Sequence, residues 1–270
     1  MLFWYYMENF KFKKSFGQNF INDQNIIHNI VDKTKIEKNS LIIEVGPGSG
    51  SLTKELAKVG KNVLCYEIDT RLEEILDENL KEYHNITIIY DDFLNRDIKC
   101  DIKDFDYENV YFVANIPYYI TTPILEKLVE SKVDFASITM MVQKEVADRF
   151  SAHVKTKNYS SITVFLNYYF DIEKLMYVSR NAFTPKPNVD SEVISLRRKK
   201  ERKVVDNEEL FFKLVRDSFK FKRKNIRNNL KNYDLNIIEE VLKQHNKDLT
   251  TRAEELELDI FIDMANSLNK

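Results

Sequence analysis

One stretch of the sequence places a strand, a glycine-rich turn and a helix in immediate succession, and few folds accommodate that order. Residues 41–45 form a short run rich in β-branched side chains, which breaks at a Gly-Pro-Gly-Ser-Gly turn at residues 46–50. Residues 51–58 then have helical spacing, and a second strand at residues 62–66 ends at the acid Glu67. This order predicts a nucleotide-binding βαβ unit.

The glycines and the acid indicate what such a unit would bind. Gly46 and Gly48 allow the main chain to approach a ligand closely, and Gly50 allows tight packing at the start of the helix. Glu67 is placed to accept hydrogen bonds from both hydroxyls of a ribose. The turn lacks the GxGxxG spacing of dinucleotide sites and follows another acid, Glu44. Both features favour S-adenosylmethionine, which has no pyrophosphate for a helix N-terminus to hold.

A second motif, Asn115-Ile116-Pro117-Tyr118, follows the apolar strand pattern of residues 110–114. In an open α/β sheet, ligands bind where such strands end. Pro117 keeps Ile116 extended, so the Asn115 amide oxygen and the Ile116 carbonyl can accept the two hydrogens of an exocyclic amine while the Tyr118 ring stacks on the base. The tetrad therefore predicts amino-group methyl transfer to adenine. The alternative is a strand that ends in a proline-containing turn.

Composition limits the remaining possibilities. The length of 270 residues and the hydrophobic content of 43% allow one large domain and a small one. The cysteines, Cys65 and Cys100, and the four histidines are scattered, so we expect neither a disulfide framework nor a metal site. Residues 1–10 are apolar for only about six positions, too few for a signal or a membrane span. We expect a soluble, cytoplasmic monomer without a membrane partner, starting at Met1 or Met7.

Charge is unevenly spread along the chain. The net charge is −2, but residues 195–231 carry +9 and residues 232–270 carry −5. A basic block in an otherwise acidic protein predicts a polyanionic partner. The alternative is that the block forms solvated helix faces in a lysine-rich protein.

Four cations of this block would share one face at helical spacing, where they could contact successive phosphates, while Phe219 and Phe221 pack inward. These cations are Lys220, Arg223, Lys224 and Arg227. A basic N-terminal arm, Lys11–Lys14, is a candidate for a second contact. The alternative is that the four cations tie two domains together through ion pairs.

The rest of the chain alternates between strand and helix patterns. Further strands are expected at residues 86–90, 136–142, 160–170 and 193–196, with helices at 122–131 and 143–150 and an exposed loop at 95–108. Beyond residue 200 only helical patterns occur, at residues 208–219, 224–230, 235–243 and 258–268. The sequence predicts an α/β fold with a seven-stranded, mostly parallel sheet over residues 1–200, and a small C-terminal all-α domain over residues 201–270.

Seven motifs occur in one order along nearly the full chain. They are Phe16–Ile21, Glu44–Gly50, Glu67–Asp69, Asp92, Asn115–Tyr118, Met141–Val146 and Phe183–Ser191. Together they resemble the ribosomal RNA adenine dimethyltransferase family, specifically the enzymes that dimethylate two adjacent adenosines near the 3′ end of small-subunit RNA. The resemblance implies a Rossmann-like S-adenosylmethionine-dependent methyltransferase domain, small-subunit ribosomal RNA or the pre-30S subunit as partner, and a role in ribosome biogenesis.

The resemblance also implies which residues contact the ligands. The cofactor-binding positions are Asn19, Ile21, Gly46, Gly48, Glu67, Asp92 and Asn115, and the catalytic ones are Asn115, Ile116, Pro117 and Tyr118. Asp92 would accept a hydrogen bond from the cofactor adenine, and the alternative is a simple helix cap. Phe183 would stack on the target base, and the alternative is a packing residue.

Two other functions fit parts of the pattern. A sister group methylates an adenine of large-subunit RNA, confers antibiotic resistance and shares the tetrad. Thr122-Pro123, Gln143-Lys144-Glu145 and the Pro185-Lys186-Pro187 loop favour the small-subunit group. The other alternative is a non-catalytic RNA-binding assembly or transcription factor on the same fold, which the presence of Glu67, Asp92 and the tetrad disfavours.

Overall fold

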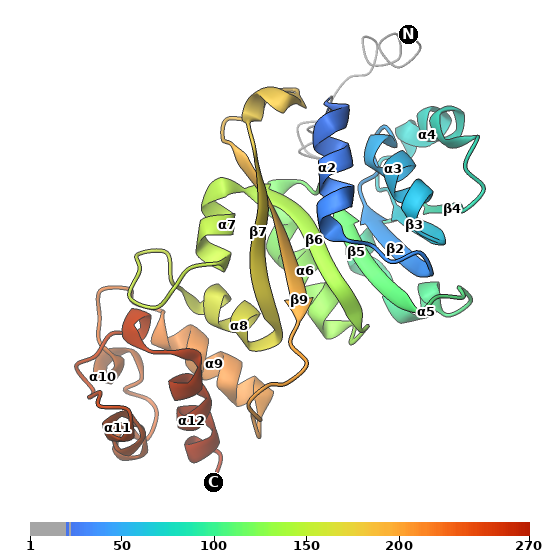
Figure 1. Cartoon of the computed structure of the whole chain (residues 1–270). Helices are drawn as coiled ribbons and strands as arrows, with labels where there is room; N and C mark the ends of the chain where they lie inside the picture. The colour runs from blue at the N-terminus through green and yellow to red at the C-terminus, as the bar shows by residue number, and fades with distance from the viewer. Residues whose placement is uncertain (1–19, 22) are drawn as a thin grey trace. The chain divides into compact units, whose positions relative to one another are not determined.

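The computed structural model describes residues 20–21 and 23–270, and its chain divides into two compact units (Figure 1). The sheet unit contains the chain up to Lys144 together with Glu173–Arg197. The helical unit contains Glu145–Ile172 and Arg198–Lys270. The second unit thus includes residues that the sequence pattern assigns to the first domain.

The elements of the chain up to Lys144 alternate between strands and helices, as expected. They are β1 (Phe20–Ile21), α2 (Gln24–Thr34), β2 (Ser40–Val45), α3 (Ser51–Val59), β3 (Asn62–Tyr66), η2 (Thr70–Leu72), α4 (Glu73–Leu80), β4 (Ile86–Ile89), η3 (Phe93–Asn95), α5 (Ile98–Ile102), β5 (Asn109–Ala114), η4 (Tyr118–Ile120), α6 (Thr121–Glu130) and β6 (Phe135–Gln143). The expected loop at residues 95–108 contains the short helix α5, whose Ile98 and Ile102 are buried.

The remaining elements include two more strands of the main sheet and the C-terminal helices. They are α7 (Lys144–Phe150), α8 (Ser161–Tyr169), β7 (Phe170–Val178), η5 (Arg180–Ala182), β8 (Phe183–Thr184), β9 (Ser191–Arg198), α9 (Glu208–Ser218), α10 (Ile226–Asn229), α11 (Leu235–Gln244), η6 (Ala253–Glu255) and α12 (Leu258–Leu268). Among the described residues no helix is long and apolar enough to cross a membrane.

The main sheet has seven strands in the order β4-β3-β2-β5-β6-β9-β7, which confirms the predicted fold class. Strands β4, β3, β2, β5 and β6 pair in parallel, whereas β9 runs antiparallel to β6. A separate two-stranded sheet joins β1 to β8. Because the five parallel strands share one direction, the residues that follow them meet at a single edge of the sheet.

Alternate residues of the central strands face two apolar layers, as expected for a sheet covered on both sides. Helices α2 and α3 lie on one face, and α5 and α6 lie on the other (Figure 1). One buried cluster joins strands β2, β3 and β5 to α2 and α3; it includes Ile42, Val63, Cys65, Tyr111 and Val113 from the strands and Ile27, Ile30, Leu52 and Leu56 from the helices. This packing fixes the ends of the strands on which the site is built.

The prediction of a strand at residues 160–170 is wrong, because this aromatic run forms helix α8 and the strand β7 starts only at Phe170. The Ser160 amide donates to Thr163 Oγ1 at 3.1 Å, which helps to start the helix. Within the helical unit the Tyr168 ring lies 5.2 Å from the Phe211 ring of α9, and Tyr169 stacks on Phe212 at 5.7 Å. These aromatic contacts group α8 with the C-terminal helices.

Candidate active site

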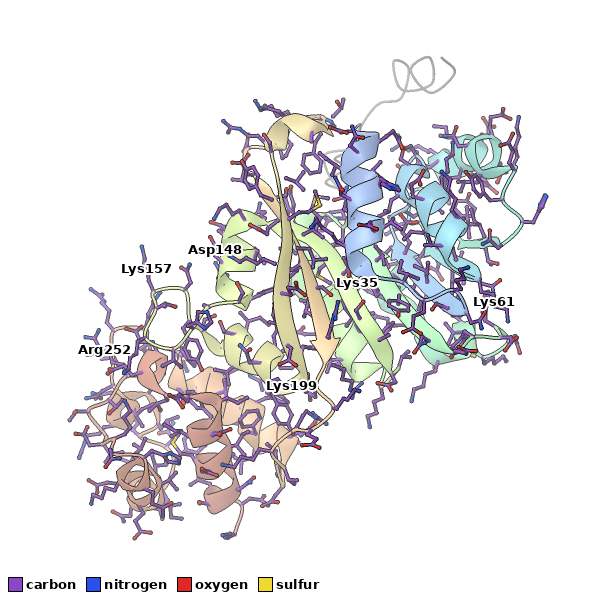
Figure 2. The ribbon with its side chains drawn as sticks, viewed as in Figure 1. Lys35, Lys61, Asp148, Lys157, Lys199 and Arg252 are labelled. Carbon is purple, nitrogen blue, oxygen red and sulfur yellow. The ribbon has the colours of Figure 1, made fainter. Side chains whose placement is uncertain are left out.

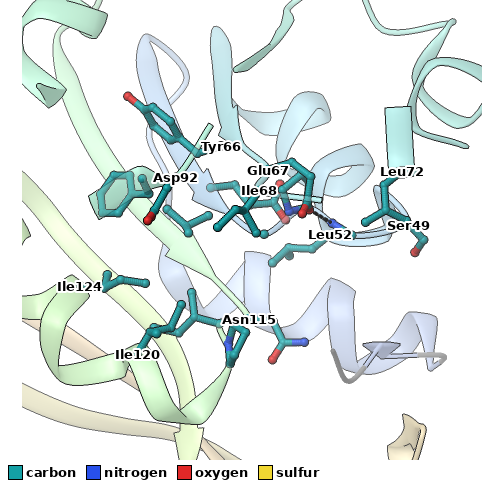
Figure 3. A pocket seen from close by; sticks show the side chains of 18 of the residues that line it. Ser49, Leu52, Tyr66, Glu67, Ile68, Leu72, Asp92, Asn115, Ile120 and Ile124 are labelled. Atoms are coloured by element: carbon teal, nitrogen blue, oxygen red, sulfur yellow. Dashed lines mark hydrogen bonds between the residues drawn. The ribbon is translucent and has the colours of Figure 1, made fainter. Parts of the chain in front are cut away.

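A cavity of about 290 Å³ opens at the carboxyl edge of the parallel strands in the sheet unit (Figure 3). Each of four neighbouring strands contributes the residues that follow it. They are Gly46–Ser49 after β2, Glu67 and Ile68 after β3, Asp91 and Asp92 after β4, and Asn115–Tyr118 after β5. The motifs that the sequence singled out therefore meet in one cavity.

The glycine turn forms one wall of this cavity. Gly46 has φ +73°, and a Cβ added to it would have no atom within 4 Å, so its main chain is open to a ligand. Gly50 has φ +80°, and a Cβ there would lie 2.9 Å from Leu80 Cδ2. Tight packing at Gly50 is therefore observed, whereas close approach of a ligand at Gly46 stays a prediction for which the space is present.

Glu67 presents a buried carboxylate to the cavity and is only 4% exposed. Its Oε1 accepts a hydrogen bond from the Asp69 amide at 2.8 Å, and its Oε2 accepts one from the Gly48 amide at 3.2 Å. Burial raises the pKa of this carboxyl group, whereas the main-chain donors oppose the increase. The two amides hold the carboxylate in a fixed orientation, as a bidentate acceptor for ribose hydroxyls requires.

Glu44 is a second buried acid behind the glycine turn, and the sequence pattern gave it no chemical role of its own. It is 1% exposed, lines the cavity and accepts a hydrogen bond from Cys65 Sγ at 3.7 Å. Burial raises its pKa to about 8, with a smaller contribution from the charge of Glu67. At neutral pH the Glu44 carboxyl is therefore mainly protonated.

Asp92 caps a helix, which is one of the two alternatives that the sequence left open, and its position leaves the other one, an adenine contact, as a prediction. Its Oδ1 caps η3 by accepting the Leu94 amide at 2.9 Å, and its side chain also lines the cavity (Figure 3). Next to it, Phe93 packs edge-on against Tyr66 at 5.0 Å. The Asp92 carboxylate thus lies beside an aromatic layer, where it can accept a hydrogen bond from an adenine amine.

The tetrad closes the other side of the cavity. Pro117 has φ −57° and ψ 136°, and η4 begins at Tyr118. Ile116 is buried, whereas Asn115, Pro117 and Tyr118 are half-buried, and all four line the cavity. Figure 3 shows the Asn115 amide across the cavity from Glu67 and Ile68. An amide oxygen here lies on the opposite side from the proposed ribose acceptor.

Two other predicted ligand residues, Ile21 and Phe183, belong to the small β1–β8 sheet. Ile21 lines the cavity, and Asn19 lies outside the described residues. Phe183 is only 4% exposed and belongs to the apolar cluster beneath α2, and it is not among the residues that line the cavity. This placement corresponds to the packing alternative, so stacking of Phe183 on a base stays a prediction that requires the ring to leave this position.

The prediction that the four cations share one helical face is wrong. Residues 219–225, here called the basic turn, connect α9 to the short helix α10, so only Arg227 is helical. The Asn229 amide group donates to the carbonyls of Ser218, at 2.7 Å, and of Phe221 and Lys224, both at 3.3 Å. These bonds replace the helical ones and hold the chain in a turn.

The cations of this region are nevertheless exposed. Lys220, Arg223, Lys224 and Arg227 all face solvent within the helical unit. Phe221 is 56% exposed and does not pack inward as predicted, whereas Phe219 contacts Tyr159 and Phe261. Figure 2 labels Lys157, whose carbonyl accepts a hydrogen bond from Lys222 Nζ at 2.8 Å. The arm Lys11–Lys14 lies outside the described residues.

The fold and the cavity define an S-adenosylmethionine-dependent methyltransferase. The open main chain at Gly46 leaves room for the cofactor, Glu67 suits its ribose and Asp92 suits its adenine. Within residues 20–21 and 23–270 no group of three His, Cys, Asp or Glu side chains could hold a metal ion. The chain belongs to the ribosomal RNA adenine dimethylase family, whose sequence model matches residues 9–270.

Individual relatives agree with this family. The chain is 43% identical to "Ribosomal RNA small subunit methyltransferase A" of Macrococcus caseolyticus over 97% of its length and 91% of the relative. A dimethyladenosine transferase from Plasmodium falciparum has the same fold, with a TM-score of 0.77 and 24% identity over 93% of this chain and 97% of that one. The 23S rRNA methyltransferase ErmE is 28% identical with a TM-score of 0.72, covering 93% of this chain and 100% of its own.

Proposed function

We propose that this protein transfers methyl groups from S-adenosylmethionine to N6 of two adjacent adenosines near the 3′ end of small-subunit ribosomal RNA, during ribosome biogenesis. The observation that carries the proposal is the position of the Asn115-Ile116-Pro117-Tyr118 tetrad in the same cavity as Gly46 and Glu67. A base amine held by the tetrad would lie next to a methyl donor held by the other two residues. The name of the Macrococcus relative supports small-subunit RNA as the substrate.

The tetrad would act by orienting the amine. The N6 lone pair of adenine is delocalised into the ring, which makes the amine a poor nucleophile. Acceptors at Asn115 Oδ1 and the Ile116 carbonyl would hold its two hydrogens and turn the lone pair out of the ring plane. Bound S-adenosylmethionine supplies an electrophilic methyl group. No general base is needed before attack, because the methylated amine is acidic enough to lose its proton to water.

The substrate base must leave its stack to reach the cavity. Extrusion costs a few kcal/mol, and stacking on an aromatic ring offsets about 1–3 kcal/mol of it. Tyr118 is the candidate for this stacking, because it lines the same cavity as Asn115. The remaining acceleration comes from holding the amine and the methyl group in line, which is worth about 7 kcal/mol or more at best.

Large-subunit RNA is the second candidate substrate. The fold similarity to ErmE supports it, since that protein acts on 23S RNA and is 28% identical to this chain. The higher identity of 43% to a small-subunit relative, over 97% of the chain, favours the first candidate. Thr122-Pro123, Gln143-Lys144-Glu145 and the Pro185-Lys186-Pro187 loop also favour it.

RNA docking on the basic turn and on Arg227, which follows it, is a further part of the proposal. Lys220, Arg223, Lys224 and Arg227 are exposed, and phosphate contacts to such residues would supply affinity without sequence reading. We also propose that the protein acts as a cytoplasmic monomer on RNA or the pre-30S particle, that Lys11–Lys14 adds a second RNA contact, and that residues 1–200 and 201–270 act as catalytic and RNA-contacting domains.

Small subunits that lack the modification provide the test. We expect the purified protein to transfer labelled methyl groups to such particles, and primer extension on the recovered RNA to stop at two adjacent adenosines near the 3′ end. Large subunits serve as the parallel substrate. Methylation of large-subunit RNA alone would replace the proposal with its second candidate, and methylation of neither would favour the non-catalytic role.

A further inference from the structure

The motif Asn188-Val189-Asp190-Ser191 contributes to the family resemblance, but the chemistry described so far gives it no role. Ser191 begins β9 and is fully buried. Its Oγ lies 2.7 Å from the hydroxyl of Tyr118, within hydrogen-bonding distance. A residue 73 positions further along the chain thus holds the outer end of the tetrad's aromatic ring.

Ser191 is itself fixed by the strand that it starts. It pairs with Gln143 at the end of β6, and the preceding carbonyl, of Asp190, accepts the Lys144 amide at 2.9 Å. The Asp190 carboxylate accepts the Arg180 amide at 3.0 Å. Two separate segments of the sheet unit therefore hold the start of β9, which fixes the position of Ser191.

The Tyr118 ring is consequently held at both ends. At its main-chain end, the Tyr118 carbonyl accepts a hydrogen bond from Thr121 Oγ1 at 3.1 Å. At its other end, the hydroxyl meets Ser191, and burial raises the pKa of the phenol, so it stays neutral. Phenylalanine would stack on a base as well as tyrosine does, so stacking alone does not require the Tyr118 hydroxyl.

We propose that Ser191 is a positioning residue for methyl transfer, which fixes the plane of the Tyr118 ring so that the extruded adenine stacks with its amine directed at Asn115. The proposal rests on the proposed function, because it assumes that an adenine enters the cavity. Ser191 touches neither ligand in this scheme and acts only through Tyr118. A small rotation of the stacked base misplaces the amine, and such misplacements reduce rates strongly.

Three variants and a matched control test the proposal. Ser191→Ala and Tyr118→Phe each remove the hydrogen bond from one side, and the double variant removes both hydroxyls. Ser195→Ala is the control, because Ser195 lies on the same face of β9 and is also buried, and its hydroxyl has no hydrogen-bond partner among the described residues. The substrate is unmethylated small subunits, with kcat, KM, cofactor Kd and melting temperature measured for each protein.

We expect Ser191→Ala and Tyr118→Phe each to lower kcat about tenfold, the effect of one hydrogen bond of about 1.4 kcal/mol. KM for the subunits and the cofactor Kd should change less than about threefold, since neither ligand contacts Ser191. The double variant should be no slower than either single one, because all three lack the same bond. Ser195→Ala should keep wild-type kcat.

The outcomes separate this inference from the function on which it rests. Wild-type kcat in Ser191→Ala would overturn the inference while leaving the proposed function intact. The inference would also be overturned if the fold losses in kcat of the two single variants multiplied in the double variant. A third contrary result would be a Ser191→Ala protein with a lower melting temperature and weaker cofactor binding but unchanged kcat. Failure of the wild-type protein to methylate the subunits would overturn the proposed function and the inference with it.

Discussion

The cavity and the basic turn both depend on charged side chains, but they hold those charges in opposite ways. Glu44 and Glu67 are 1% and 4% exposed, and two main-chain amides fix the Glu67 carboxylate. Arg223 and Lys224 are exposed, and their side chains form no ion pair within residues 23–270. If both regions act as proposed, the cavity should depend on the position of each group, whereas the turn should depend on its total charge.

This difference predicts how each region responds to substitution. In the cavity a single exchange alters desolvation or geometry and should have a large effect on one measured property. On the turn an exchange removes one of several screened interactions and should have a smaller, salt-dependent effect.

Glu44→Gln should have the largest effect, and on stability. The wild-type carboxyl has a pKa of about 8 in the folded protein and about 4.5 when unfolded, so between these values the folded state holds the extra proton. Wild-type stability should therefore fall as pH rises through this window, by about 1.4 kcal/mol per pH unit. Glutamine does not titrate, so the variant should gain about 4 kcal/mol relative to wild type between pH 5 and pH 8.

Urea unfolding of both proteins without cofactor at pH 5 and pH 8 measures this gain. Glu67 also has a raised pKa, but it is present in both proteins and largely cancels in the comparison. Cys65→Ala is the control for the neighbouring thiol, which donates to Glu44. Equal pH dependence in wild type and Glu44→Gln would mean that Glu44 is already ionised in the folded protein.

Asn115→Ala should abolish most methyl transfer while the fold and most of the cofactor affinity persist. The main task of its amide is to orient the target amine, and misplacing a reacting group costs on the order of a hundredfold or more in rate. Calorimetric cofactor binding and a methylation assay on the same preparation check both parts. Near-wild-type transfer would exclude the tetrad from the mechanism.

The arrangement of the cavity follows from the sequence because four of its lining residues come shortly after parallel strands. Gly46, Glu67, Asp92 and Asn115 are far apart in the chain, but the topology of a parallel sheet brings strand ends together whatever the intervening helices do. Local patterns that locate the strands therefore locate the site. The hydrogen bond between Tyr118 and Ser191 was not predicted. It depends on β9, which runs antiparallel and lies between β6 and β7, a position that the pattern of parallel strands does not give.

The predictions of a strand at residues 160–170 and of a helical face for the four cations are wrong because tertiary partners decide the local structure there. The run Ile162-Thr163-Val164-Phe165 has strand propensity, yet it is helical because α8 packs its aromatic side chains against α9. The basic turn has helical spacing, yet the Asn229 side chain takes up the carbonyls that a helix would use. Neither partner is visible in a short window of sequence.

Glu67→Ala should weaken S-adenosylmethionine binding by roughly ten- to a hundredfold. Two ribose hydroxyls would lose a charged acceptor, and such a hydrogen bond is worth about 1.5–3 kcal/mol. Calorimetric titration with the cofactor measures the change, and Asp106→Ala, which removes an exposed acid of the same unit, is the control. An unchanged Kd in Glu67→Ala would mean that the glycine turn binds a different ligand.

The smallest of these effects is expected for the basic turn, where we reverse Arg223 and Lys224 to glutamate. RNA affinity near 0.1 M salt should fall about tenfold, and the slope of log affinity against log salt should flatten by about two units, without a change in cofactor Kd. The control reverses Lys99 and Lys103, two exposed residues at α5 with the same total charge change. If docking depends on the turn, the control should lose much less affinity. Unchanged RNA affinity with a lower melting temperature would instead make Arg223 and Lys224 structural residues, and the RNA would have to bind elsewhere.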